Sequence, residues 1–141
     1  MTNKLMTHIA ALLMLAASLP AQTTFPVSRK QVAHIPFSFS ADEHTFPAGT
    51  YLLETDPEKR VVVLRGENQE ARFILANREE LREAPQKGEL VFQRYGSRFI
   101  LKAVHVQGSY EAESLPSGKV EREWAKAGQP QQLVMVQTGS R

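Results

Sequence analysis

The chain has 141 residues, no cysteine and a formal net charge of +2, with acidic and basic side chains interleaved along its length. A chain without cysteine holds neither disulfides nor thiolate metal sites, and the even charge pattern argues against a nucleic-acid-binding or anionic-membrane surface. The length fits one domain with a hydrophobic core of its own.

Residues 1–21 have the pattern of a secretory signal peptide. Lys4 precedes an apolar run that ends at Leu19, and a short stretch closing at Ala21 follows. The apolar run is about half of the ~20 residues that a membrane-spanning helix needs, and Pro20 ends it. We expect cleavage after Ala21, with cleavage after Ser18 as the alternative, and a periplasmic or extracellular mature protein without a membrane span.

The rest of the chain divides into three segments. Residues 22–31 are expected to be a polar lead-in, and residues 138–141 a polar tail. Between them, residues 32–137 contain short apolar stretches separated by tight turns. This pattern predicts a single all-β domain, either an antiparallel sandwich or a small barrel of about seven strands, with one short helix.

Alternation of apolar and polar residues begins near the start of the domain. Ile35, Phe37 and Phe39 share one parity, which predicts a half-buried strand over residues 34–40, and Pro36 places it at an edge or a bend. Residues 60–65 are β-branched and apolar on both parities, which predicts a central strand covered on both faces.

Further strands are predicted over residues 51–55, 70–76 and 133–137. In the second of these, Phe73 is among the side chains expected to fill the core. The alternation of apolar and polar residues ends after this strand. Asn77 and the glutamate three residues later have the spacing of a capping box. This spacing predicts one or two helical turns directly after the strand.

The hairpin around Gly96-Ser97 has the strongest local pattern. Two apolar stretches separated by this dipeptide predict a two-residue turn of type II′. In the register that this turn sets, Tyr95 lies opposite Arg98, Arg94 opposite Phe99, Phe92 opposite Leu101, and Leu90 opposite Ala103.

A short helix is predicted over residues 119–127. Val120, Trp124 and Ala127 fall on one stripe of it, and a glycine suited to a helix C-cap follows. We expect Trp124, the single tryptophan, to anchor this helix on the core.

A set of short motifs follows the signal peptide in a fixed order. They are Ile35-Pro36-Phe37-x-Phe39, Pro47-Ala48-Gly49-x-Tyr51, Leu90-Val91-Phe92-x-Arg94-Tyr95-Gly96 with Arg98-Phe99 across the turn, and Leu115-Pro116 followed by Glu121-Arg122-Glu123. Over roughly residues 30–127, this order resembles a family of small, uncharacterised exported proteins from environmental bacteria. The resemblance implies a single exported β domain and brings no activity, cofactor or catalytic residue with it.

Enzyme motifs are missing from the sequence. It contains no G-x-S-x-G, no H-E-x-x-H, no phosphate-binding glycine loop and no dinucleotide motif. His34, His44 and His105 lack the spacing of a metal motif, so we expect no metal site and no cofactor. The sequence therefore favours a non-enzymatic protein.

Five aromatic and basic side chains are the candidate binding residues: Tyr51, Arg94, Tyr95, Arg98 and Tyr110. Tyrosine and arginine are enriched in binding hot spots. The alternative interpretation is that Tyr95 and Arg98 are a cross-strand pair that stack on each other.

Together these patterns favour an exported, non-enzymatic β domain that acts by binding or structural association, with an envelope or extracellular protein as its partner. The alternatives are a small barrel that carries an apolar ligand and, less favoured, a hydrolase of unfamiliar type. Interior volume distinguishes the binding domain from the ligand carrier, because a domain whose middle is filled by phenylalanine side chains has no room for a ligand.

Overall fold

The computed structural model describes residues 28–140, so the expected signal peptide lies outside the described residues. Within that range the elements are β1 (Arg29–Ile35), β2 (Phe39–Ala41), β3 (His44–Phe46), β4 (Gly49–Asp56), β5 (Val61–Arg65), β6 (Ala71–Leu75), β7 (Asn77–Glu80), β8 (Glu89–Tyr95), β9 (Arg98–His105), β10 (Glu111–Ser114), α1 (Lys119–Lys126) and β11 (Gln131–Ser140). The predicted all-β class with one short helix is confirmed, although the strands are more numerous than expected. No helix in this part of the chain is long and apolar enough to cross a membrane.

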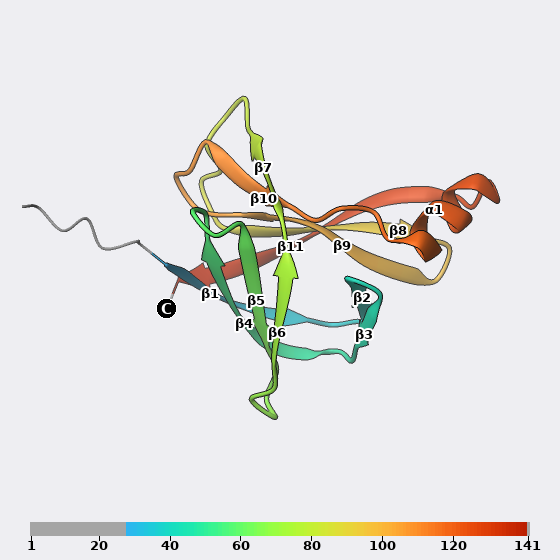
Figure 1. The fold of residues 1–141 in the computed structure, drawn as a ribbon, viewed down its shortest axis with the longest axis horizontal. Helices are drawn as coiled ribbons and strands as arrows, with labels where there is room; N and C mark the ends of the chain where they lie inside the picture. Colours follow the sequence, from blue (N-terminus) through green and yellow to red (C-terminus); the bar gives the residue numbers. More distant parts are fainter. Residues whose placement is uncertain (1–27, 141) are drawn as a thin grey trace, which may run out of the picture.

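The strands form one sheet that curls on itself (Figure 1). Its main path runs β3-β2-β9-β8-β11-β1-β4-β5-β6, and β2 with β9 is its parallel pair. β10 pairs with both β9 and β7, and β7 follows β6 after the single residue Ala76. β10 therefore joins the two sides of the curl at one end. At the other end, β6 and the β2–β3 hairpin face each other across an unpaired gap.

Side chains from both sides of the curl fill its middle. β4 shows the alternation, since every second residue from Tyr51 to Thr55 is buried. The large, fully buried apolar side chains are Phe39, Phe92, Ile35, Leu53, Leu64, Leu90 and Leu101. Phe37 and Phe99 stack with ring centroids 3.9 Å apart and pack against this core. Most of the phenylalanines expected in the middle are therefore there, and Phe73 is the exception.

β6 buries the face opposite to the one predicted. Ile74 is buried, whereas Phe73 and Leu75 point outward and are 69% and 73% exposed. On β5, Val62 lies opposite Ile74 and is buried, while Val63 lies opposite Phe73 and is only partly buried. Because directly opposed residues share a face, β5 determines the buried face of β6. β5 itself was predicted to be covered on both faces and is covered on one.

Residues 77–80 form strand β7 instead of the helical turns that were predicted. Arg78 lies opposite Glu113 and Glu80 opposite Glu111, so this segment pairs along its whole length with β10. A capping box is worth only about 1 kcal/mol, and it competes here with a ladder of backbone hydrogen bonds to a strand distant in sequence. Tertiary pairing therefore overrides the local preference.

Strands extend into both the expected lead-in and the expected tail, and the two segments pair with each other. β1 begins at Arg29 and β11 ends at Ser140. Gln31 lies opposite Ser140, and Ala33 lies opposite Thr138. Neither segment has the apolar content of a strand, so only the pairing partner makes them strands.

Pro36 divides the first predicted strand in two. β1 ends at Ile35 and pairs with β4 and β11, whereas β2 begins at Phe39 and pairs with β3 and β9. Proline has no N–H to donate to a sheet ladder, so the pairing stops there. The predicted bend is confirmed, and it carries the chain from one side of the curl to the other.

The predicted β8–β9 hairpin is confirmed near its turn. Gly96 has a φ of 62°, as the first turn position of a type II′ turn requires, and Phe92 lies opposite Leu101. Farther along, a bulge between Val91 and Phe92 shifts the register, so that Leu90 lies opposite Val104 instead of Ala103. A turn sets only the register next to it, and a bulge changes the rest.

Candidate binding site

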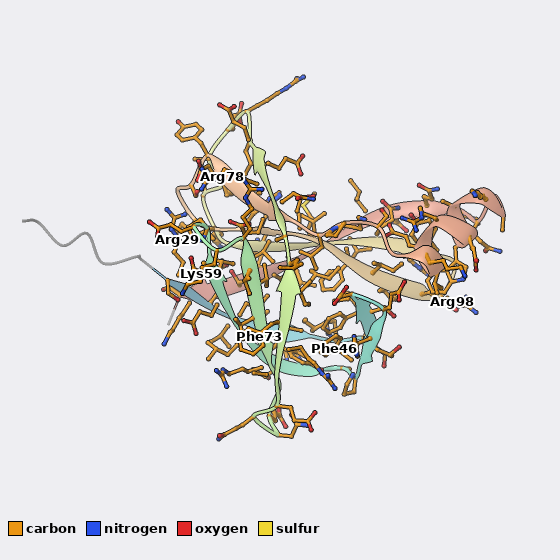
Figure 2. The ribbon with its side chains drawn as sticks, in the orientation of Figure 1. Arg29, Phe46, Lys59, Phe73, Arg78 and Arg98 are labelled. Carbon is orange, nitrogen blue, oxygen red and sulfur yellow. The ribbon has the colours of Figure 1, made fainter. Side chains whose placement is uncertain are left out.

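A cleft opens where β6 faces the β2–β3 hairpin. One part, of about 400 Å³, lies between the β3–β4 turn and the β5–β6 loop. A second part, of about 210 Å³, continues between the edges of β3 and β6. His44, Phe46 and Arg72 line both parts. Figure 2 labels Phe46 and Phe73, which lie on the two sides of this cleft.

The edge of β6 that faces away from β5 has free backbone groups. The Ala76 N–H donates to the Arg60 carbonyl at 2.9 Å, so Ala76 points its backbone groups toward β5. These groups alternate along a strand in an antiparallel pair. Those of Ala71, Phe73 and Leu75 therefore point away from β5, where no strand of the described chain pairs with them.

Arg72 is the one charged residue on this edge strand, and it shares the inner face with Ile74. Proteins usually protect edge strands by proline, charged side chains, a bulge or shortness. β3, at the other end of the path, has three residues. β6 has five, ARFIL, and pairs with β5 without a register shift. Apart from Arg72, β6 has none of these protections and is the more open edge of this sheet.

An apolar surface lies beside that edge on the outer face of the sheet. Phe73 and Leu75 project there, next to the partly exposed Val63 and Val61 that oppose them on β5. We call these four residues the β6 patch. Isolated exposed apolar residues are common, but a contiguous group on an open edge is typical of an interaction surface.

Tyr51 contributes its ring, not its hydroxyl, to the cleft. The ring packs edge-on against Phe39 and Phe46, with centroids 5.3 and 6.1 Å away. The hydroxyl donates to the Pro47 carbonyl at 2.6 Å, and burial, aided by the charge of Glu67, raises the pKa of Tyr51. The hydroxyl is thus committed to holding the β3–β4 turn.

A second polar cluster lies under α1. Glu121 is only 5% exposed, and its carboxylate accepts hydrogen bonds from the Tyr95 hydroxyl at 3.1 Å and from Lys102 Nζ at 3.0 Å. Lys102 also donates to Ser117 Oγ at 2.8 Å. Burial and the nearby Glu121 charge raise the pKa of Tyr95. All three charged or polar groups are satisfied by one another, which is typical of a structural anchor.

The expected stack of Arg98 on Tyr95 is not formed. The Arg98 guanidinium lies 4.4 Å from the Trp124 ring centroid instead, and Arg94 lies over Phe99 at 5.5 Å. Tyr95 turns its hydroxyl inward to Glu121, so its ring is buried and the partly buried Trp124 contacts the arginine. Trp124 was predicted to anchor α1 on the core. Its ring does contact the buried Tyr95, with centroids 6.2 Å apart, but the residue of the helix that is buried is Glu121.

The five candidate binding residues do not form one surface. Arg94, Tyr95 and Arg98 lie together at the β8–β9 turn, beside α1. Tyr51 lines the cleft, and the exposed Tyr110 lies beyond the opposite end of β9. Figure 2 shows Arg98 next to the helix, away from the labelled Phe46 and Phe73.

The sequence pointed to Tyr51, which lines the cleft, but not to the residues that form its open edge. Arg72, Phe73 and Leu75 belong to a strand whose alternation was recognised, but an edge strand has the same local pattern as an internal one. The one available signal was negative, since residues 70–76 contain no proline.

The three histidines among the described residues lie on different strands with separate partners. His34 Nδ1 is 3.3 Å from Thr50 Oγ1, His44 Nδ1 is 2.8 Å from the Asp42 carbonyl, and His105 Nδ1 is 3.8 Å from a Glu89 carboxylate oxygen. Over residues 28–140, no three histidine, aspartate or glutamate side chains form a group that could hold a metal ion.

Comparison of this chain with protein-family models, curated proteins and solved structures found no match. The resemblance to a family of exported proteins therefore stays an expectation from the sequence.

Proposed function

We propose that this protein is an exported, non-enzymatic β domain that acts by associating with other polypeptides, and that it binds them at the free edge of β6. A segment that adds to a sheet edge gains main-chain hydrogen bonds, while its side chains fill neighbouring surface. At β6, the backbone groups of Ala71, Phe73 and Leu75 are available for such main-chain hydrogen bonds. The β6 patch and the adjoining cleft are the surface that the side chains of the added segment would fill.

One observation supports this proposal above the others. Phe73 and Leu75 are the most exposed large apolar side chains in the described chain, and they lie on an edge strand whose outward backbone groups have no pairing strand within it. Such an edge is a hazard for a secreted protein unless something pairs with it.

The filled interior weighs against the carrier alternative. Phe39, Phe92 and Leu101 occupy the middle of the curl and are at most 1% exposed. Carriage of an apolar ligand needs an enclosed space of several hundred Å³ in that position. The cleft beside β6 opens to the surface and is lined by charged as well as apolar residues.

A hydrolase would need an activated group in a cleft. Glu113 is buried on β10, and burial raises the pKa of its carboxyl. It lines neither part of the cleft. A perturbed carboxyl outside the cleft gives the hydrolase interpretation no support.

Affinity capture with the mature domain, residues 22–141, tests the proposal on the envelope fraction of the native host. The test variant is Ala71→Pro, which removes an N–H that points away from β5 and leaves the β5 ladder in place. The control is Leu133→Lys, a change at an exposed position on β11. We expect a defined protein to be retained by wild type and the control, and lost with Ala71→Pro.

Two results would contradict the proposal. Recovery of the same protein in equal amounts with all three baits would show that the β6 edge is not the binding site. Recovery of a small molecule without any protein would favour the carrier instead. Matching far-UV circular dichroism spectra of the three baits establish that each variant is folded.

A further inference from the structure

We infer that the partner at the β6 edge is a second copy of this chain, whose β6 pairs antiparallel with the first about a two-fold axis at Phe73. This inference depends on the proposed function, because it names the partner for the same edge. It follows from the register that β6 allows and from the residues that are directly opposed in this register.

The register follows from the direction of the backbone groups. Only Ala71, Phe73 and Leu75 point N–H and C=O groups at a partner. With the axis at Phe73, this residue opposes its own copy and Ala71 opposes Leu75 of the second chain. Every outward N–H on both strands then meets a carbonyl.

The neighbouring two-fold registers are worse. An axis at Arg72 places two arginine side chains directly opposite each other, which is destabilising, and leaves Leu75 beyond the paired region. An axis at Ile74 places Ala71 opposite Asn77, which already pairs with Ser114 on β10. β6 is therefore self-complementary in a single register.

The side chains agree with that register. On the outer face, Phe73 meets Phe73 of the second copy and Ala71 meets Leu75, so all directly opposed pairs there are apolar. On the inner face Arg72 opposes Ile74 of the second copy. Each Arg72 also lines its own cleft, where Glu67 and Glu70 provide opposite charge. The contact is isologous, as in the most common class of homo-oligomer.

The natural lack of cysteine makes a direct test possible. Phe73→Cys places two thiols opposite each other across the axis, with Cα atoms about 5.5 Å apart, which is within disulfide range. Ala71→Cys is the matched control, because its two copies lie about 13 Å apart along the paired strands. The double variant Ala71→Cys/Leu75→Cys restores an opposed pair and keeps Phe73.

We expect oxidation of the mature domain to give disulfide-linked dimer as the main product for Phe73→Cys and for the double variant, and monomer for Ala71→Cys. Sedimentation velocity of the wild type should show a dimer that forms with rising concentration and is lost in Ala71→Pro. Equal cross-linking of the two single cysteine variants would overturn the inference, since random collision has no register.

The inference and the proposed function fail separately. A wild type that stays monomeric at high concentration, yet captures a different protein in a manner that Ala71→Pro abolishes, overturns self-pairing and leaves edge binding standing. A monomeric wild type whose captured proteins do not depend on Ala71 overturns both.

Discussion

Glu121 shows how a charged residue can dock a helix. Its two carboxylate oxygens accept from Tyr95 on β8 and Lys102 on β9, while Val120 beside it is exposed. A buried carboxylate is costly unless it is hydrogen-bonded, so these partners determine where α1 lies. A search for apolar periodicity selects Trp124 on this helix and misses the residue that is buried.

We expect Glu121→Ala to lower the free energy of unfolding by about 2–3 kcal/mol, because it leaves the Tyr95 hydroxyl and the Lys102 ammonium without their partner. Trp124→Ala should cost less, since the indole is partly exposed and its contact with Arg98 is worth about 1 kcal/mol. Urea unfolding of both variants measures the difference. A larger loss for Trp124→Ala would mean that the helix docks through the indole after all.

Glu113 is a buried carboxylate of another kind. It is 5% exposed, and its Oε2 atom accepts no hydrogen bond from residues 28–140. Burial raises the pKa of its carboxyl, with smaller contributions in the same direction from Glu111 and Asp56 and opposing ones from Arg78 and Arg29. The folded state therefore holds this proton more tightly than the unfolded chain does.

A raised pKa in the folded state has a definite effect on stability. The contribution of Glu113 is most favourable below the unfolded pKa of about 4.3 and is lost as the pH rises through the higher folded value. Glu113→Gln replaces the carboxyl with an amide that does not titrate, so the variant does not lose this stability as the pH rises. Denaturant unfolding across pH 4 to 8 should show the variant gaining stability relative to wild type as the pH rises. A constant difference at every pH would show that Glu113 does not titrate in this range.

At the scale of elements, β3 and β6 end the same sheet in different ways. β3 is short, and its hairpin holds the N-terminus of α1, because Glu43 Oε1 accepts the Lys119 N–H at 3.1 Å. β6 is longer, and its outward backbone groups lack a pairing strand within the described chain. Both edges line the cleft, and the greater length of the β6 edge is what makes it the candidate site.

β1 and β11 illustrate strands formed by their partners. Thr138 Oγ1 donates to the buried Gln31 side chain, and the Thr138 N–H donates to the Gly88 carbonyl at 2.9 Å. Each contact joins the end of the chain to a segment far away in sequence. The tail is thus part of the sheet.

Deleting residues 138–141 should therefore destabilise the domain. We expect a loss of about 1–3 kcal/mol, because Gln31 stays buried without its hydroxyl partner and β1 loses a neighbouring strand. Thr138→Val separates the two causes, since it keeps the strand and removes the side-chain bond. Thermal unfolding measures both variants, and an unchanged melting temperature after the deletion would show that the tail contributes nothing to the sheet.

At the scale of the whole molecule, β10 produces the asymmetry of the curl. It joins β9 to β7 at one end, and β7 continues directly from β6 (Figure 1). At the opposite end no strand of residues 28–140 bridges β6 and the β2–β3 hairpin. β10 therefore closes one end of the curl, and the open end holds the cleft.

Export is a prediction about the whole molecule. It is tested by where the protein is found and by which residue is its first. The full chain, expressed in its native host, should appear in the periplasmic or culture fraction with Gln22 as its first residue. A first residue of Leu19 would identify the alternative cleavage after Ser18. An intact N-terminus on protein held in the cytoplasm or the inner membrane would contradict export.

Local sequence was enough to predict the fold class, the hairpin turn and the alternation. Each depends on neighbours in the chain: Gly96 allows a positive φ, Pro36 interrupts a ladder, and period-two patterns arise from the pleat itself. The register of β8 with β9 was predictable only up to the bulge at Val91 and Phe92, because a bulge responds to packing on both faces of a sheet.

The candidate site could not be predicted from the sequence, because it too depends on packing between segments. Whether Phe73 or Ile74 faces the core depends on β5, and whether β6 is an edge depends on where β3 and β10 end. The sequence by itself determined which residues share a face of each strand. The tertiary structure alone decided which face is buried and which edge stays open, because burial and pairing are contacts between segments far apart in the chain.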